Sequence, residues 1–157
     1  MARRNRIIKD GGAYHITNRI NTREKLLEPA HFKHLFLHVL LEAKTKYRFH
    51  IRNITIMDNH VHILIKMEHG QSLSKLMQWV FSVFAMRYNH ICGRTGHLWE
   101  GRFKSVLLEG IAAFAKVFEY ICNNPVKAGI TDTVETYAFG YYKLVTSPVY
   151  YRLFCFD

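Results

Sequence analysis

Two histidines separated by a single apolar residue are the most chemically informative feature of the chain. They are His60 and His62, inside the largely apolar stretch 57–65. Side chains two residues apart in a β-strand point to the same face, so the two imidazoles are expected to lie side by side. Val61 and Ile63 then point to the opposite, apolar face, which suits the core. Imidazole is the commonest metal ligand, so the pair is either a metal site or two ordinary surface histidines.

A tyrosine and an asparagine later in the chain form a second candidate group. Tyr120 and Asn124 are four residues apart, which places them on one face of a predicted helix. Two neutral imidazoles and one amide oxygen suit Mg²⁺ or Mn²⁺, which would act as a Lewis acid on a phosphodiester. A tyrosine hydroxyl can attack phosphorus and form a covalent intermediate. The spacing alone equally fits a packing role for Tyr120 and a helix-ending role for Asn124 before Pro125.

The elements that must position these residues follow from hydrophobic periodicity. Strands are predicted over residues 14–20, 51–57, 60–67 and 103–109, and helices are predicted to begin near Pro29, Ser72 and Ala112. A two-residue turn at 58–59 joins the second and third strands and pairs Thr55 with His62. Pro125 disfavours helical geometry at Asn124, so the last helix is expected to end there.

The order of these elements predicts an α+β fold. Strand, helix, strand, strand, helix, strand is the order of a ferredoxin-like (RRM-like) antiparallel sheet with its helices on one face. The extra helix that carries Tyr120 must lie near the opposite face if it is to meet the histidines. We expect residues 1–157 to form one domain, with a basic arm at 1–12 and an aromatic C-terminal tail at 146–157. The tail is expected to cover either the chain's own core or that of a partner.

Composition points to an anionic partner. Lys and Arg number 22 against 12 acidic residues, a formal charge of +10, and nucleic acid is the first candidate for such a field. The cysteines are far apart and lack zinc spacing (Cys92, Cys122 and Cys155), which is typical of reduced thiols in the cytoplasm. No signal peptide, membrane span or nucleotide-binding P-loop is expected from the sequence.

Basic residues interleaved with aromatic residues supply candidate DNA contacts. The candidates are Arg3, Arg4, His15, Arg19, Arg94, Trp99, Arg102 and Lys104. Cations suit a single-stranded or hairpin backbone, and Trp99 can either stack on a base or pack in the core. His15 and Arg19 either share the face of the histidine pair or are ordinary strand positions. The basic arm is either a phosphate contact or a frayed terminus.

Three motifs in a fixed order resemble a known family. Residues 59–64, 101–105 and 120–129 resemble motifs of the IS200-like (Y1) transposases, of the HUH type, and look closest to the REP-associated tyrosine transposase branch. The likeness runs from about Tyr14 to Tyr142. It implies that His60 and His62 bind the metal, that Tyr120 is the nucleophile and that Asn124 completes the metal site.

The resemblance also implies a reaction. Family members cleave single-stranded DNA next to hairpins, leave a 5′-phosphotyrosine and a free 3′-hydroxyl, and rejoin strands without a nucleotide cofactor. Such an enzyme is expected in the cytoplasm with the nucleoid, as a monomer or a homodimer. Two alternatives stay open: a rolling-circle-type replication initiator or relaxase that uses the same histidine pair, and a non-catalytic ferredoxin-like module that binds nucleic acid.

Overall fold

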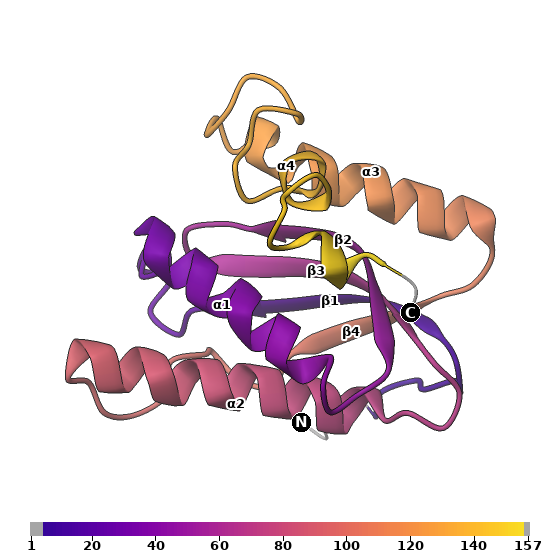
Figure 1. Ribbon diagram of the computed structural model, residues 1–157, viewed down its shortest axis with the longest axis horizontal. Coiled ribbons are helices and arrows are strands. Elements are labelled where there is room, and N and C mark those ends of the chain that lie inside the picture. Colours follow the sequence, from indigo (N-terminus) through magenta and orange to yellow (C-terminus); the bar gives the residue numbers. More distant parts are fainter. Residues whose placement is uncertain (1–4, 156–157) are drawn as a thin grey trace.

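A four-stranded antiparallel sheet organises the computed structural model, which describes residues 5–155 (Figure 1). The strand order across the sheet is β2-β3-β1-β4, as the ferredoxin-like prediction requires. The strands are β1 (Ala13–Arg19), β2 (Phe49–Ile56), β3 (His60–Met67) and β4 (Lys104–Leu108). The predicted strand positions are therefore confirmed to within about two residues.

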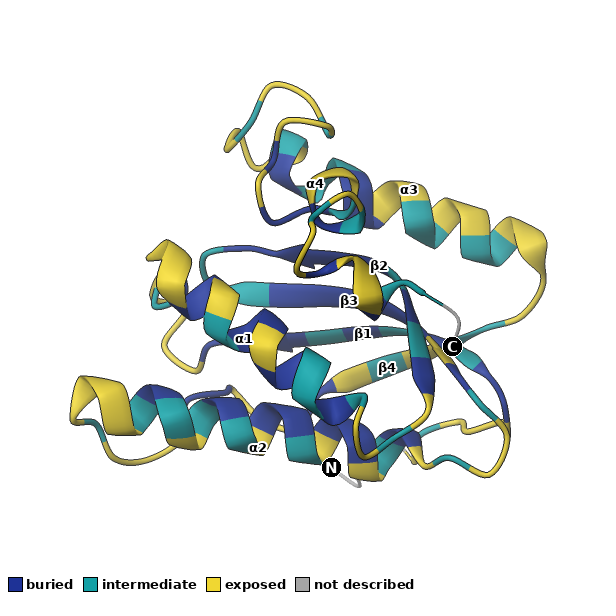
Figure 2. Ribbon diagram, viewed as in Figure 1, coloured by how far each residue is buried: buried dark blue, intermediate teal, exposed yellow. Residues whose placement is uncertain are grey.

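Two helices cover one face of the sheet and enclose the core. α1 (Ala30–Ala43) and α2 (Leu73–Cys92) run side by side in Figure 1, and Figure 2 shows buried residues where they meet the strands. Helix α2 begins as predicted, because the Ser72 hydroxyl accepts a hydrogen bond from the Lys75 amide at 3.3 Å. It ends at Gly93, whose φ of 61° is a left-handed conformation that glycine adopts without strain.

The β2–β3 hairpin has the predicted register. Thr55 pairs with His62, and the amide of Met57 donates to the carbonyl of His60 at 2.9 Å. A β-bulge between Ile51 and Asn53 was not predicted. It inserts Arg52 as an extra residue and resets the alternation of β2, so that Ile51 faces the core, while Asn53 keeps the face of Thr55 and His62.

Helix α3 (Ile111–Lys127) lies on the opposite face from α1 and α2 and packs on β2 and β3. This is the face predicted for the tyrosine-bearing helix. The prediction that this helix ends at Asn124 is wrong, because the helix continues through Pro125 to Lys127. A proline inside a helix leaves the carbonyl four residues earlier without its usual partner, and here Thr55 of the sheet takes that carbonyl, which belongs to Ile121.

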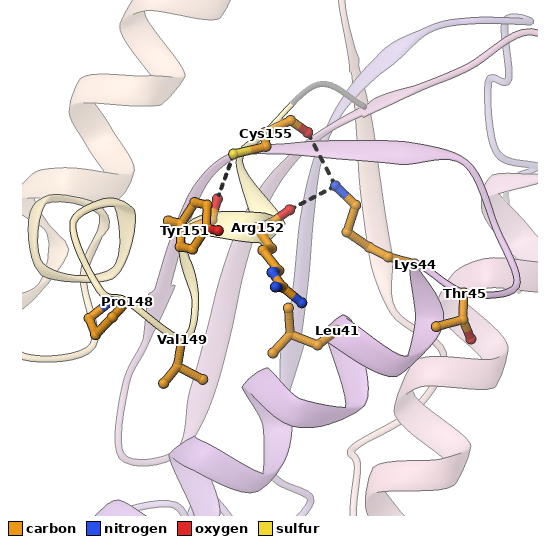
Figure 3. Close-up of a pocket in the computed structure, with 8 residues that line it drawn as sticks. All are labelled: Leu41, Lys44, Thr45, Pro148, Val149, Tyr151, Arg152 and Cys155. Atoms are coloured by element: carbon orange, nitrogen blue, oxygen red, sulfur yellow. Dashed lines mark hydrogen bonds between the residues drawn. The ribbon is translucent and has the colours of Figure 1, made fainter.

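The C-terminal segment packs on its own chain. After α4 (Tyr141–Val145), Tyr150 and Leu153 are buried in the core, and Leu153 is the last residue of the short 3₁₀ helix η1 (Tyr151–Leu153). Figure 3 shows Lys44 at the end of α1 donating to the carbonyls of Arg152 and Cys155, at 2.9 and 3.2 Å. The described part of the predicted tail therefore covers this chain's own core, and residues 156–157 lie outside the described part.

The described cysteines are all free, in line with the predicted reduced thiols. Over residues 5–155, no helix combines the length and the apolar character that a membrane crossing requires.

Candidate active site

The floor of the site is the face of the sheet turned away from α1 and α2. Val61 and Ile63 of β3 are fully buried in the core, so His60 and His62 project from the other face, as predicted. Cross-strand partners share a face, which places Arg19 of β1 beside His60. The imidazole ring centroids of His60 and His62 are 5.0 Å apart.

Helix α3 brings Tyr120 and Asn124 to this floor. The Tyr120 ring centroid lies 5.7 Å from that of His62 and 5.9 Å from that of His15. The Asn124 side chain lies beside His60 and His62 and acts to raise the pKa of both imidazoles. Tyr120 remains 44% exposed, so its ring lies at the border of the site and leaves the site open to solvent. Residues some sixty positions apart in sequence therefore meet on one face.

His15 belongs to the same cluster. Its Nε2 lies 3.0 Å from Nδ1 of His62, and the two rings stack with centroids 5.3 Å apart. The sequence suggested His15 as a DNA contact and, as one alternative, as a neighbour of the histidine pair, and the structure places it on their face in contact with His62. The register of β1 against β3 causes this meeting, because His15 and His62 lie on adjacent strands, two positions apart in the pairing and so on the same face.

Asn59 is a residue of the site that the sequence suggested only as part of a turn. Its Oδ1 lies 2.7 Å from Nδ1 of His60, and its Nδ2 donates to the carbonyl of Arg23 at 3.0 Å. The second contact fixes the amide so that Oδ1 points at the imidazole. Its position directly before the first histidine was the available signal.

Burial keeps the imidazoles neutral. Burial, with smaller contributions from the nearby His60, His15 and Arg19, lowers the pKa of His62 to about 3, while the Asn124 side chain acts in the opposite direction. Burial likewise lowers the pKa of His60 and of His15. At neutral pH each of these rings therefore has a lone pair available, as a metal ligand requires.

A buried ion pair holds the turn that precedes the histidines. Lys33 Nζ lies 2.7 Å from Asp58 Oδ1, with side chains 6% and 18% exposed, and it also donates to the carbonyl of Glu28. The carbonyl of Asp58 accepts from the amide of Leu27 at 2.8 Å, and that of Asn59 accepts from Ile20. The turn is thus fixed from both sides.

The predicted DNA contacts are not all in one place. Arg19 and Lys104 lie on the histidine face, with Lys104 exposed and two strands away from His62. Arg102 is exposed just before β4, while Arg94 lies away from the site, 6.0 Å from the ring of Tyr88. Arg3 and Arg4 fall outside the described residues.

Trp99 requires a correction. It is 8% exposed, packs against Phe81 and Phe84, and donates its indole N–H to the carbonyl of Phe81 at 3.0 Å. Both the ring and its polar group are used in the core, so Trp99 is not a platform on which a base could stack. The alternative of core packing was the right one.

A second basic area continues the histidine face. A cavity lies under the N-terminal half of α3, between Phe114 and the sheet, and Arg52 and Lys66 contribute its cations. Lys66 is four residues along β3 from His62, or about 13 Å. The positive charge on this face therefore extends beyond the histidine cluster.

The donor atoms fit a divalent cation. His60 Nδ1 and His62 Nδ1 already have partners in Asn59 and His15, so their Nε2 atoms are the ones left to bind an ion. The Asn124 side chain, which lies beside both rings, adds an amide oxygen. Within residues 5–155 no group of three or more His, Cys, Asp or Glu could hold a metal, so any site here depends on that amide.

Comparison with known proteins identifies relatives of this chain. A family described as "Transposase IS200 like" matches residues 9–124. The structure is similar to that of a REP-associated tyrosine transposase bound to a REP hairpin, with a TM-score of 0.77, 22% identity, and coverage of 100% of this chain and 93% of that one.

A second solved structure is more distant. It is that of a putative transposase from Deinococcus radiodurans R1, with a TM-score of 0.54 and 16% identity over 78% of this chain and 97% of that one. At these identities both likenesses concern the fold. No curated protein sequence matches the chain.

Proposed function

This chain belongs to the IS200-like transposase family, and from that premise we propose that it is a metal-dependent enzyme that cuts and rejoins single-stranded DNA beside a hairpin. One observation carries the proposal. A half-exposed tyrosine, two neutral imidazoles and an amide meet on one face of the sheet, and all four belong to the same chain.

Tyr120 is the proposed nucleophile. Its hydroxyl oxygen attacks phosphorus, a bond from that oxygen to phosphorus forms, and the bond from phosphorus to the 3′-oxygen breaks. The phenolic proton leaves to solvent, and the departing 3′-oxygen takes up a proton to become a hydroxyl. Rejoining is the reverse: a 3′-hydroxyl attacks the 5′-phosphotyrosine and releases Tyr120. Each step exchanges one phosphoester bond for another of similar energy, so rejoining needs no nucleotide cofactor.

His60, His62 and Asn124 are the proposed ligands of Mg²⁺ or Mn²⁺. When bound, the ion would polarise the scissile phosphate and offset the charge that develops on it. Asn59 and His15 orient the two imidazoles from behind, through their Nδ1 atoms. Asn124 lies one helical turn after Tyr120, so a single helix positions both the nucleophile and a ligand.

We place the single strand on the half of the sheet that α3 leaves uncovered. Helix α3 packs on β2 and β3, so β1 and β4 remain open beside the histidines. Arg19 and the exposed Lys104 are on that half, and Arg102 lies at its end. Each can bind a backbone phosphate. The relative that binds a REP hairpin supports a hairpin as the partner.

The rest of the proposal concerns organisation. Residues 1–157 form one domain that works as a monomer, with Tyr120 acting in cis, because α3 lies on its own sheet and the described tail covers its own core. The enzyme acts in the cytoplasm, on the nucleoid.

The decisive experiment uses a labelled single-stranded hairpin oligonucleotide with Mn²⁺ or Mg²⁺. We expect a covalent protein–DNA adduct on a denaturing gel, absent with EDTA and absent in Tyr120→Phe. Tyr151→Phe, an exposed tyrosine of the C-terminal segment, is the matched control and should form the adduct normally. An adduct that persists in Tyr120→Phe would show that another tyrosine is the nucleophile. Tight hairpin binding with no adduct over a range of hairpins would favour a non-catalytic binding module.

A further inference from the structure

The helix that carries Tyr120 contains a proline in its last turns. Pro125 lies inside α3, which runs on to Lys127. Proline has no N–H, so the carbonyl of Ile121, four residues earlier, has no partner within the helix. Ile121 is fully buried, and a buried carbonyl without a partner is unfavourable. Some other donor must satisfy it.

Thr55 supplies that donor from the sheet. Its hydroxyl donates to the Ile121 carbonyl at 3.2 Å, and its side chain is fully buried. Thr55 is the cross-strand neighbour of His62. The carbonyl that Pro125 leaves free is therefore bonded by the residue next to the histidine that Tyr120 faces.

Asn53 makes a parallel contact two residues earlier on β2. Its Nδ2 donates to the carbonyl of Phe118 at 3.0 Å and contacts Sγ of Cys122 at 3.1 Å. Among the described residues its Oδ1 has no hydrogen-bond partner, whereas the Thr55 hydroxyl is fully used as a donor. Thr55 is therefore the better residue to substitute, because its hydroxyl makes a single bond to α3 and Asn53 makes two contacts.

We propose that Thr55 and Pro125 are a positioning pair that sets the rotation and depth of α3, so that Tyr120 and Asn124 face the histidines. Both residues are buried, so their proposed role is to position the helix and not to contact DNA or the reacting atoms. Pro125 exposes one carbonyl between Tyr120 and Asn124, and Thr55 binds that carbonyl at one place on the sheet. Sliding or turning the helix would break this bond. The inference rests on the proposed function, because it assigns Tyr120 and Asn124 their roles.

Four variants separate positioning from simple stability. Thr55→Val removes the donor with little change in shape, and Thr55→Ser keeps it. Pro125→Ala restores an N–H that can bond the Ile121 carbonyl within the helix. In the double variant Thr55→Val/Pro125→Ala, the carbonyl is satisfied again, but the tie between helix and sheet is absent.

The readouts are the rate of adduct formation at saturating hairpin DNA, the hairpin affinity and the midpoint of thermal unfolding. We expect Thr55→Val to lower both the rate, by about 10- to 100-fold, and the midpoint, with affinity little changed. Thr55→Ser should recover both. The double variant should recover the unfolding midpoint but keep the low rate. A rate that recovers together with the midpoint would overturn the proposal, because Thr55 would then serve stability alone.

A matched control removes the same type of bond elsewhere. The Thr146 hydroxyl donates to the carbonyl of Tyr142 at 3.1 Å in the C-terminal segment, and Thr146→Val should leave the rate unchanged. The positioning can also be tested without activity, from the NMR signals of the Asn124 side-chain amide. These should shift in the double variant and not in Thr146→Val, and unshifted signals would overturn the proposal. If the wild type forms no adduct, the proposed function fails, and this NMR comparison still decides whether the pair positions the helix.

Discussion

Replacing His15 by phenylalanine tests how the proposed metal site is held. The change keeps an aromatic ring but removes Nε2, the atom 3.0 Å from Nδ1 of His62. The tautomer of His62 that leaves Nε2 free for a cation carries its proton on Nδ1, and that N–H needs an acceptor. Without His15, the ring of His62 loses both this tautomer preference and part of its orientation.

The size of the effect follows from the burial of His62. Loss of an outer partner of a ligating histidine weakens metal binding by about 10- to 100-fold, or about 1.4–2.7 kcal/mol. His62 is only 5% exposed, so water has little access to replace the lost acceptor. We therefore expect the upper half of this range for His15→Phe.

The assay is titration of DNA-free protein with Mn²⁺, followed by electron paramagnetic resonance of the free ion. His15→Gln is the control, because its side-chain oxygen can still accept from His62, and its affinity should fall only by about threefold. Hairpin affinity without metal should be similar in wild type and His15→Phe. Folded His15→Phe that binds Mn²⁺ as tightly as wild type would refute the assigned role of His15.

Four further outcomes are expected from stability, pH and DNA binding. Lys33→Met leaves the mostly buried Asp58 without its cation and should lower the free energy of unfolding in urea by about 2–4 kcal/mol. Trp99→Ala should cost about 3–5 kcal/mol in the same assay, with the hairpin affinity of the folded variant unchanged. The stability of the metal-free protein should fall as the pH drops from about 6.5 towards about 3, because unfolded His62 binds a proton in that range and folded His62 does not; His62→Gln should flatten this part of the curve. Lys104→Gln should weaken hairpin binding and reduce its salt slope by about 0.7.

Each of these has a contrary outcome. Wild-type stability in Lys33→Met would mean that the turn does not depend on the ion pair. Weaker hairpin binding by folded Trp99→Ala would mean that the indole reaches DNA. A pH profile unaffected by His62→Gln would assign the acid instability to other groups, and an unchanged salt slope in Lys104→Gln would place the strand elsewhere.

Local patterns were enough to predict the hairpin that carries the histidines. The turn at 58–59 and the apolar alternation of β3 agree on one register, and a slip of one residue would bury His62 in the core. The same reasoning predicted Ser72 as a helix cap and the order of the strands. In these places the sequence signal and the structural constraint involve residues close together in the chain.

Contacts between distant segments were beyond such patterns. The bulge at Arg52 turns Ile51 towards the core, and nothing in the alternation of β2 indicates it. The pairing of His15 with His62 depends on how β1 aligns with β3. Pro125 predicted a helix end because proline lacks the N–H that a helix uses. Local patterns could not show that Thr55, seventy positions earlier, bonds the carbonyl that this leaves free.

Polar docking of α3 explains how one face of the sheet serves both positioning and access. Thr55 and Asn53 hold α3 by directional bonds to its backbone, and such bonds specify one rotation, whereas apolar packing tolerates sliding. Both residues lie on β2, so the helix is fixed at one side of the sheet. The side with Arg19 and Lys104 stays uncovered for a substrate. The accuracy that the proposed nucleophile Tyr120 needs is therefore achieved without enclosing it, which suits the long, single-stranded polymer proposed as the substrate.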